Sequence, residues 1–318
     1  MRIANVLFVH KDAKLVERQI FALEHQDFDF YLHVDKKSNF LEFQGLSELP
    51  NTQFVSRRAV MHWGGFGFIR AIIQSLEDVL NSGKQYDFVN LLTGQDYPIK
   101  KVSYIYDFFS ANIGKSFLTY ETPPSLWWNQ SMQRFRQYHM TDYSFKGRTR
   151  IEQFLTAVLP PRKFPLPYKL YGGPCASYWT ISMDAAVYLY EFLKTTMSRK
   201  QRMFFKHTWG SDEFLISTVL LNSPFKDSIV NNNQRYIDWT MGGAHPKIIT
   251  MADVHKLERS GRLFARKFDS KIDAQVLDYV DTHLLGRDTA GSHTRYAAQL
   301  SQSQGGAVSR GQGAIITL

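Results

Sequence analysis

Hydrophobic residues in the first third of the chain alternate between strand-like and helix-like patterns. Residues 3–9 and 88–92 are apolar runs typical of strands buried on both faces, and residues 28–34 indicate another strand. Between them, residues 12–25 and 66–81 carry apolar side chains at helical spacing. This rhythm predicts βαβ units, and therefore an α/β fold with a Rossmann-like, mainly parallel central sheet flanked by helices.

Ligands of a parallel sheet bind beyond the carboxyl ends of its strands. The segments 10–12, 33–38 and 93–98 directly follow the three predicted strands. We therefore expect these segments to contribute to a binding site.

The pattern changes in the second half of the chain. Residues 122–170 are rich in Arg, Tyr, Trp and Pro, which indicates a loop-rich insertion of the kind that shapes substrate sites. Residues 177–194 predict a strand that leads into a helix, and 211–222 predict a nearly all-apolar helix. A short strand or loop is expected over 262–268 and a last helix over 271–285.

Gly, Ser and Gln dominate the end of the chain, and the apolar periodicity fades there. We predict a single domain over residues 1–286 and a low-complexity, disordered tail over 287–318.

Composition and charge narrow the class of protein. The hydrophobic share of the 318 residues is 44%, enough for a sizeable core, and the net charge of +9 favours an anionic partner. The single cysteine, Cys175, allows no intramolecular disulfide and fits a reducing compartment. No apolar run reaches the roughly 18 residues of a membrane-spanning helix. The expected location is the cytoplasm, and peripheral contact with the inner face of a membrane is left open.

Two acidic residues begin the apolar helix predicted over 211–222. Ser211 fits its N-cap, and Asp212 and Glu213 would occupy its first turn. Acids there offset the helix dipole, which explains both residues without any function. Alternatively, one carboxylate faces a cavity, where the positive helix end keeps it ionised and ready to accept a proton.

Other segments combine polar groups with tight turns. Trp63-Gly64-Gly65 precedes a helix, where two glycines would allow close approach to an anion or simply a tight connection. Asp96 follows the third strand, either on the ligand face or in a turn. The D-x-D pattern of metal-dependent sugar transferases occurs at residues 27–29, but at the wrong end of its strand, so we interpret it as coincidental.

Lys247 and Lys267 are each flanked by apolar residues, unlike most surface lysines. Together they could bind a diphosphate without a metal ion, although either one alone is more often a surface charge.

In this order, the segments resemble the core-2/I-branching β-1,6-N-acetylglucosaminyltransferase and peptide-O-xylosyltransferase family, glycosyltransferase family 14. The resemblance covers about residues 1–285 and rests on an ordered set of short motifs. They are His33-Val34-Asp35, Trp63-Gly64-Gly65, Gly94-Gln95-Asp96-Tyr97-Pro98-Ile99, Asp212-Glu213, Thr218-Val219-Leu220-Leu221-Asn222-Ser223-Pro224, Arg235-Tyr236-Ile237-Asp238-Trp239 and Leu263-Phe264-Ala265-Arg266-Lys267-Phe268-Asp269.

The resemblance implies a GT-A-like fold and an inverting transfer from a UDP-sugar, with neither metal nor other cofactor. Glu213 matches the general base, and the diphosphate would meet basic side chains at Lys247, Lys267 and Arg266. The nucleoside side would contain His10, Asp35, Trp63 and Gly64. The sugar and acceptor side would contain Asp96, Asp212, Trp239 and Glu121.

The donor and acceptor are less defined than the chemistry. We favour N-acetylglucosamine as the transferred sugar, because the family is associated more with the branching enzymes than with the xylosyltransferases. Xylose is the alternative. Animal members carry a membrane anchor and disulfides. We expect this chain to have neither, and therefore to be a bacterial-type member acting on a glycan, a lipid-linked glycan or a protein.

Two hypotheses of other classes remain at this stage. A nucleic-acid-binding protein would use aromatic and basic residues of the insertion, but no specific nucleic-acid motif occurs. These residues are Trp127, Trp128, Arg134, Phe135, Arg136 and Tyr138. A non-catalytic carbohydrate-binding scaffold would need no base, yet Glu213 and both lysines are present.

Overall fold

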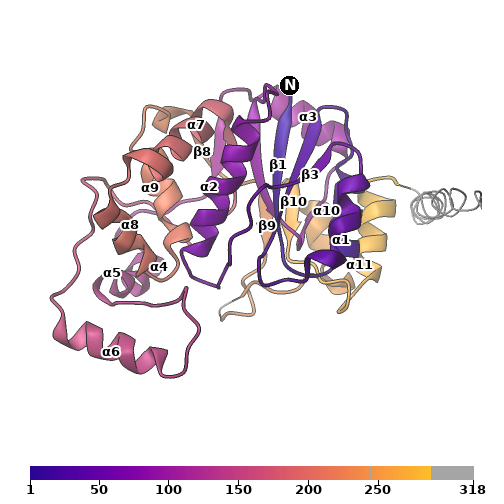
Figure 1. The fold of residues 1–318 in the computed structure, drawn as a ribbon. Coiled ribbons are helices and arrows are strands. Elements are labelled where there is room, and N and C mark those ends of the chain that lie inside the picture. The colour runs from indigo at the N-terminus through magenta and orange to yellow at the C-terminus, as the bar shows by residue number, and fades with distance from the viewer. Residues whose placement is uncertain (244, 288–318) are drawn as a thin grey trace, which may run out of the picture.

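A seven-stranded sheet forms the centre of the computed structural model, which describes residues 1–243 and 245–287 (Figure 1). Its strand order is β3-β2-β1-β4-β7-β6-β8. The strands are β1 (Ile3–Val9), β2 (Phe28–Val34), β3 (Thr52–Phe54), β4 (Phe88–Thr93), β6 (Ser116–Leu118), β7 (Trp179–Ser182) and β8 (Ile229–Asn231).

The sheet is mainly parallel, as the sequence predicts. β1 pairs in parallel with β2 and with β4, and β2 pairs in parallel with β3. Only β7 runs antiparallel to its two neighbours, β4 and β6. Every residue of β1 and β2 is buried because both faces are covered, which confirms the α/β class.

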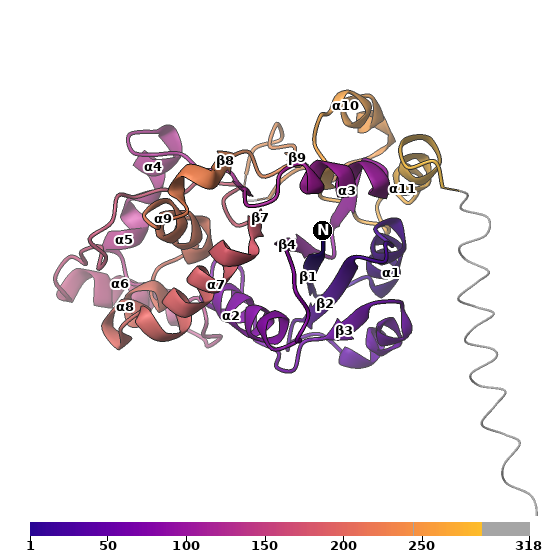
Figure 2. The same ribbon diagram turned by 90° about the horizontal axis from the view of Figure 1, so that it is seen from above.

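Helices cover the two faces of the sheet (Figures 1 and 2). Alternate residues of β1 enter different cores: Val6 packs with residues of α2 (Gly67–Leu80), α7 (Met183–Glu191) and α9 (Leu215–Leu221). Leu7 packs with residues of α1 (Ala13–Ala22) and α3 (Val102–Ser110).

A second, three-stranded sheet lies beyond the carboxyl end of β4. Its strands are β5 (Asp96–Pro98), β10 (Phe264–Arg266) and β9 (Arg235–Ile237), in the order β5-β10-β9. Residues of α10 (Val254–Arg259) and α11 (Gln275–Tyr279) share a core cluster with this sheet. Because β5 begins three residues after β4 ends, the small sheet adjoins the edge where we expected a site.

The remaining helices are short and lie mainly in or beside the insertion. They are α4 (Leu126–Ser131), α5 (Gln133–Arg136), α6 (Arg148–Val158) and α8 (Arg199–Lys206). Figure 1 shows α6 at the edge of the molecule, away from the central sheet. Single 3₁₀ or π turns occur at Phe40–Glu42, Gln44–Glu48, Phe192–Thr196, Ser211–Glu213, Lys226–Ser228, Met251–Asp253 and Val280–Leu284.

The helix predicted over 211–222 is wrong at its start. Ser211–Glu213 form a 3₁₀ turn, Phe214 leaves helical geometry with φ −141°, and α9 begins only at Leu215. The hydroxyl of Ser211 donates to the carbonyls of Phe205 and Thr208, so it does not cap the helix.

Two other helices are shorter than predicted. The helix expected over 12–25 covers Ala13–Ala22, and the last helix begins at Gln275 instead of 271 because the carboxylate of Asp269 holds the preceding turn. The predicted tail lies outside the described residues from 288 onward.

The D-x-D sequence at residues 27–29 has a structural role, as interpreted. Asp29 accepts charge-assisted hydrogen bonds from Arg2 (2.6 Å) and Lys84 (2.6 Å) at the amino end of β2. This ion cluster lies at the opposite end of the strand from the expected site.

A buried guanidinium joins the two sheets. Arg235 of β9 donates to the side chains of Asn90 (2.6 Å) and Thr180 (3.2 Å) and to the carbonyl oxygens of Leu91 (2.8 Å) and Trp179 (3.1 Å). Burial lowers the pKa of Arg235 to about 10. These acceptors belong to β4 and β7, so this one side chain fastens the small sheet to the large one.

We expect Arg235→Ala to lower the free energy of unfolding by about 3–5 kcal/mol, because several buried acceptors lose their only cationic donor. Urea denaturation followed by circular dichroism measures this change. As a control, Arg57→Ala removes an exposed ion pair with Glu77 and should cost at most about 1 kcal/mol. Equal effects of the two substitutions would contradict the structural role of Arg235.

Candidate active site

Glu213 stands at the end of the 3₁₀ turn that precedes α9. Gly210 begins this turn with a left-handed φ of 67°, and the backbone amide of Gly173 donates to the carbonyl of Glu213 (3.0 Å). A Cβ on Gly172 would lie 2.6 Å from that same carbonyl oxygen, so only glycine fits there. Gly172 therefore allows a second backbone segment to support the Glu213 turn.

The carboxylate of Glu213 binds the guanidinium of Arg134, which α5 supplies from the insertion. Arg134 is itself held between two indoles, with its guanidinium carbon 4.2 Å from the ring centre of Trp209 and 5.4 Å from that of Trp127. From the sequence, Arg134 was a candidate only for binding nucleic acid. No spacing in the sequence connects Arg134 with Glu213, which lies 79 residues further along the chain.

Burial and, to a lesser extent, the neighbouring charge of Asp212 together raise the pKa of Glu213 to about 7, although Arg134 acts to lower it. The expectation that a helix end keeps Glu213 ionised is wrong, because α9 begins after it and burial dominates. A carboxyl group of this pKa exchanges a proton close to neutral pH, which suits a general base.

Two further acidic residues lie close to Glu213. Asp212 accepts a hydrogen bond from the hydroxyl of Ser177 (2.6 Å), and burial raises its pKa. The backbones of Glu121 and Gly172 exchange two hydrogen bonds as an isolated antiparallel bridge. This pairing brings Glu121 beside the Glu213 turn. The structure thus brings together three acidic residues that the sequence analysis assigned to catalysis and to the acceptor side.

Arg266 and Asp96 form a buried ion pair in the small sheet. Their side chains lie 3.1 Å apart, and Asp96 also accepts a hydrogen bond from the amide of Thr93 (2.6 Å). The guanidinium of Arg266 stacks 3.8 Å from the ring centre of Tyr178. Asp96 is fully buried and is paired with Arg266, so we interpret its role as holding that guanidinium in place.

Cys175 and Trp239 connect the Arg266 side of the site with the Glu213 side. The indole of Trp239 donates to the Cys175 sulfur (3.3 Å). Burial raises the pKa of the Cys175 thiol, and the charges of Arg266, Glu213 and Glu121 also act on it. One neighbourhood therefore holds both the candidate base and a candidate diphosphate-binding residue.

The two candidate lysines differ in their surroundings. Lys247 forms an ion pair with Asp253 (2.6 Å). Among the described residues, the ammonium of Lys267 has no hydrogen-bond or ion-pair partner. Burial together with Arg266 and Lys11 lowers its pKa, although the charge of Asp269 acts to raise it. A half-buried, unpartnered cation beside other cations favours an anionic ligand, so Lys267 is the stronger candidate of the two.

The predicted nucleoside residues lie at the carboxyl ends of β1 and β2. Asp35 is buried, and its carboxylate accepts hydrogen bonds from the amides of Lys37 (3.0 Å) and Met61 (3.3 Å). His10 directly follows β1, and the hydroxyl of Ser38 donates to the His10 carbonyl (2.8 Å). Asp35 therefore holds together the loops that contain Lys37 and Met61 at this edge of the sheet.

The glycines after Trp63 serve close packing. Gly64 has a φ of 71°, and a Cβ there would lie 2.4 Å from the Trp209 indole nitrogen. The start of α2, considered above as a possible anion site, instead receives the carboxylate of Asp142 from the insertion, 3.2 Å from the Gly67 amide. Trp63 itself is 58% exposed and packs edge-on against Trp209.

A cavity of about 250 Å³ opens beside this pair of indoles. It is lined by Trp63 and Trp209 together with His62, His139, Arg148 and Glu152. Trp63 is exposed and Trp209 is half-buried. Accessible indole surface beside polar side chains is suited to binding a sugar ring, since one face is apolar and the rim supplies hydrogen bonds. The indole of Trp209 also packs against the guanidinium of Arg134, so the cavity adjoins the ion pair between Arg134 and Glu213.

Within residues 1–243 and 245–287, no three His, Cys, Asp or Glu side chains come together in a way that could hold a metal ion. No helix in that part of the chain has the length and apolar character needed to cross a bilayer.

The nucleic-acid hypothesis loses most of its support in the structure. Trp128 is fully buried and Phe135 nearly so, and both belong to the core beneath the insertion. Arg134 is engaged by Glu213. These side chains are therefore not free to stack on exposed bases.

Comparison with known proteins adds independent information. Residues 3–259 match the family described as Core-2/I-Branching enzyme. The chain is 30% identical over 308 residues to xylosyltransferase 2 of Rattus norvegicus, covering 90% of this chain and 34% of that protein. It is 29% identical over 314 residues to xylosyltransferase 1 of Mus musculus, covering 92% and 31%. The chain thus spans about a third of the length of these relatives.

A solved structure described as mouse xyloside xylosyltransferase 1, in its apo form, is more distant. It aligns with 83% of this chain at 8% identity and a TM-score of 0.39, too low to carry an argument. The family assignment rests on the sequence match, which extends over most of the described residues. The chain belongs to the Core-2/I-branching enzyme family, the glycosyltransferase family that its motifs resemble.

Proposed function

We propose that this protein is an inverting glycosyltransferase that moves a sugar from a UDP-sugar to a hydroxyl group of an acceptor, without a metal ion. The carboxylate of Glu213 accepts the proton of that hydroxyl. The acceptor oxygen then bonds to the anomeric carbon, while the bond from that carbon to the UDP oxygen breaks and UDP leaves with the electron pair.

The single observation that carries this proposal is the environment of Glu213. Its pKa of about 7 allows it to take a proton near neutral pH and to release it after turnover. The Arg134 guanidinium limits how far burial raises the pKa of Glu213. The indole-lined cavity beside this pair provides a place for the acceptor.

The leaving UDP needs positive charge close to its diphosphate. Lys267 and Arg266 are adjacent in the chain, and Lys267 has no ion-pair partner among the residues described. Such cations stabilise charge that grows on the diphosphate in the transition state. Lys247 remains the third predicted contributor, and it would share its ammonium with Asp253.

The donor sugar is the finer question. The sequence favours N-acetylglucosamine, whereas the names of the relatives above favour xylose. The same residues would hold UDP in either case, so the site described here supports a UDP-sugar of either kind.

We expect UDP to bind with micromolar affinity in EDTA and in manganese alike, because the diphosphate is held by side chains. Lys267→Ala should weaken binding at least about tenfold, and the exposed Lys271→Ala should leave it unchanged. Calorimetry with UDP, UDP-N-acetylglucosamine and UDP-xylose measures this and identifies the tighter donor. Absence of binding by all three would refute a UDP-sugar transferase, and binding that requires manganese would refute its metal independence.

Glu213→Gln should lower turnover by about a hundredfold or more, because the amide cannot accept the acceptor proton. UDP affinity should stay near that of the unaltered protein, since Glu213 is not placed at the diphosphate. Initial rates of UDP release with a sugar acceptor measure the first quantity and calorimetry the second. The exposed Glu191→Gln serves as the control. Undiminished turnover in Glu213→Gln would exclude Glu213 as the base.

The pH profile should respond to Arg134. Because Glu213 acts as a carboxylate, kcat/KM should rise with pH through about 7. Arg134 lowers the pKa of Glu213, so Arg134→Gln should move this rise to higher pH and depress the rate at pH 7 more than at pH 9. Arg134→Lys should restore part of the shift, and the exposed Arg136→Gln should cause none. A uniform loss of rate at every pH would contradict this role.

A further inference from the structure

Helix α6 is amphipathic, yet it turns its polar side toward the protein. Glu152 accepts a hydrogen bond from the amide of Met140 (2.6 Å), and Thr156 accepts one from the amide of Tyr138 (3.1 Å). These two residues are four positions apart and therefore lie on the same side of the helix. No residue of α6 is buried.

The apolar side of α6 faces away from the protein. Ile151, Phe154 and Val158, at spacings i, i+3 and i+7, are 43%, 63% and 57% exposed. Leu159, directly after the helix, and Phe145, before it, are 39% and 42% exposed. We call Ile151, Phe154 and Val158 the outer face of α6. Apolar faces on surface helices normally turn to the core, so an outward one indicates a partner.

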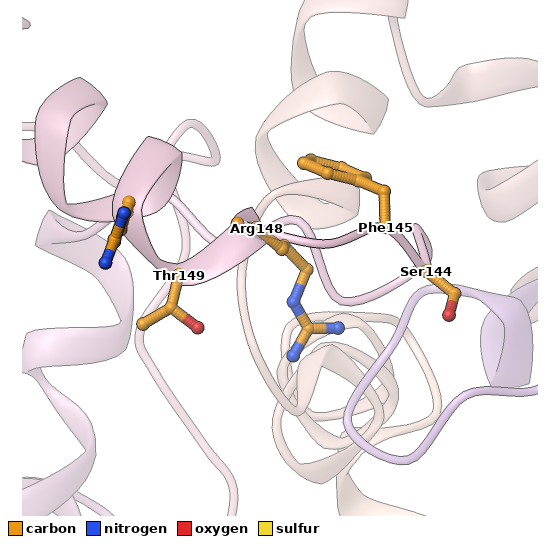
Figure 3. A pocket seen from close by; sticks show the side chains of 6 residues that line it. Ser144, Phe145, Arg148 and Thr149 are labelled. Carbon is orange, nitrogen blue, oxygen red and sulfur yellow. The ribbon is translucent and has the colours of Figure 1, made fainter.

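The segment that contains α6 is strongly basic. Residues 122–170 contain eight Lys and Arg against two Asp and Glu, which is +6 of the chain's net +9. Lys146, Arg150 and Lys163 are exposed next to α6. An open cavity of about 470 Å³ beside the first turn is lined by Arg148 and Arg150, with Phe145 nearby (Figure 3).

We propose that the outer face of α6 docks this protein onto an anionic membrane surface. Exposed apolar side chains on one side of a helix, with basic residues around them, are the features of helices that lie in the plane of a lipid interface. The apolar side chains enter the acyl boundary, and the cations meet anionic headgroups. A nucleic acid would use the cations but not the outer face, which favours the membrane.

This surface adjoins the candidate acceptor cavity. Arg148 and Glu152 of α6 also line the cavity beside Trp63 and Trp209. If the proposed function holds, docking keeps that cavity within about one helix diameter, roughly 10 Å, of the lipid surface, where a lipid-linked glycan would present its hydroxyl. The docking itself does not depend on the reaction.

Co-sedimentation of the full chain with vesicles tests the proposal. We expect binding to vesicles of phosphatidylcholine and phosphatidylglycerol, and little binding to phosphatidylcholine alone. Phe154→Glu combined with Val158→Glu should weaken the binding roughly tenfold or more, since each buried side chain contributes a comparable factor. Leu41→Glu combined with Ile272→Glu is the matched control, because both residues are exposed (70% and 60%) elsewhere.

A second variant covers the charge contribution. Lys146→Glu combined with Arg150→Glu alters only exposed residues and should also weaken binding to the anionic vesicles. Circular dichroism and thermal unfolding establish that each variant remains folded. UDP affinity in solution, measured separately, should be unchanged in all of them, so failure of the proposed reaction and failure of docking are distinguishable.

Three results would overturn the docking proposal. The first is equal binding to neutral and anionic vesicles, or binding to neither. The second is unaltered binding by the Phe154→Glu and Val158→Glu variant. The third is a dimer in light scattering that this variant dissociates, which would assign the outer face to a second copy of the chain.

Discussion

The buried guanidinium of Arg235 sets the position of the small sheet, and through it the cationic side of the candidate site. Arg235 is fixed by acceptors on β4 and β7, and it pairs in register with Phe264 of β10. Two residues further along β10, Arg266 lies opposite Asp96. Because the strands pair in this register, fixing Arg235 also fixes the positions of Arg266 and of the neighbouring Lys267. A charge without a carboxylate partner is costly to bury, so the arrangement depends on neutral acceptors satisfying it.

The acidic side of the site depends on a different constraint, the close approach of two chain segments. Gly172 and Gly173 lie against the Glu213 turn, where a side chain at Gly172 would collide with it. This contact contributes to the burial that raises the pKa of Glu213, and the insertion supplies the opposing charge of Arg134. The proton affinity of the candidate base is therefore a balance between two effects, and they come from separate parts of the sequence.

This division explains what the sequence could predict. The long strands β1, β2 and β4 and helices α1 and α2 were predictable, because their patterns are local and nearly every residue of the strands is buried. The three-residue strands β5 and β9 were not predicted, since their pairing is entirely non-local. The start of α9 was mistaken because Ser211 bonds to a preceding helix instead of capping its own.

The candidate site was predictable to a similar extent. The motifs singled out Glu213, Arg266 and Lys267 as candidates, but nothing local distinguishes Lys267 from Lys247, whose partner Asp253 lies six residues away. Arg134 was not predicted as a partner of Glu213 because the two residues lie far apart in the chain, as do the strands that pair with β5 and β9. The insertion also shows why periodicity alone can mislead. The spacing of apolar residues in α6 is that of a packed helix, yet its polar side makes the bonds to the protein. The two amides that α6 binds, those of Tyr138 and Met140, lie just after α5, so these hydrogen bonds connect α6 with the helix that supplies Arg134 to Glu213.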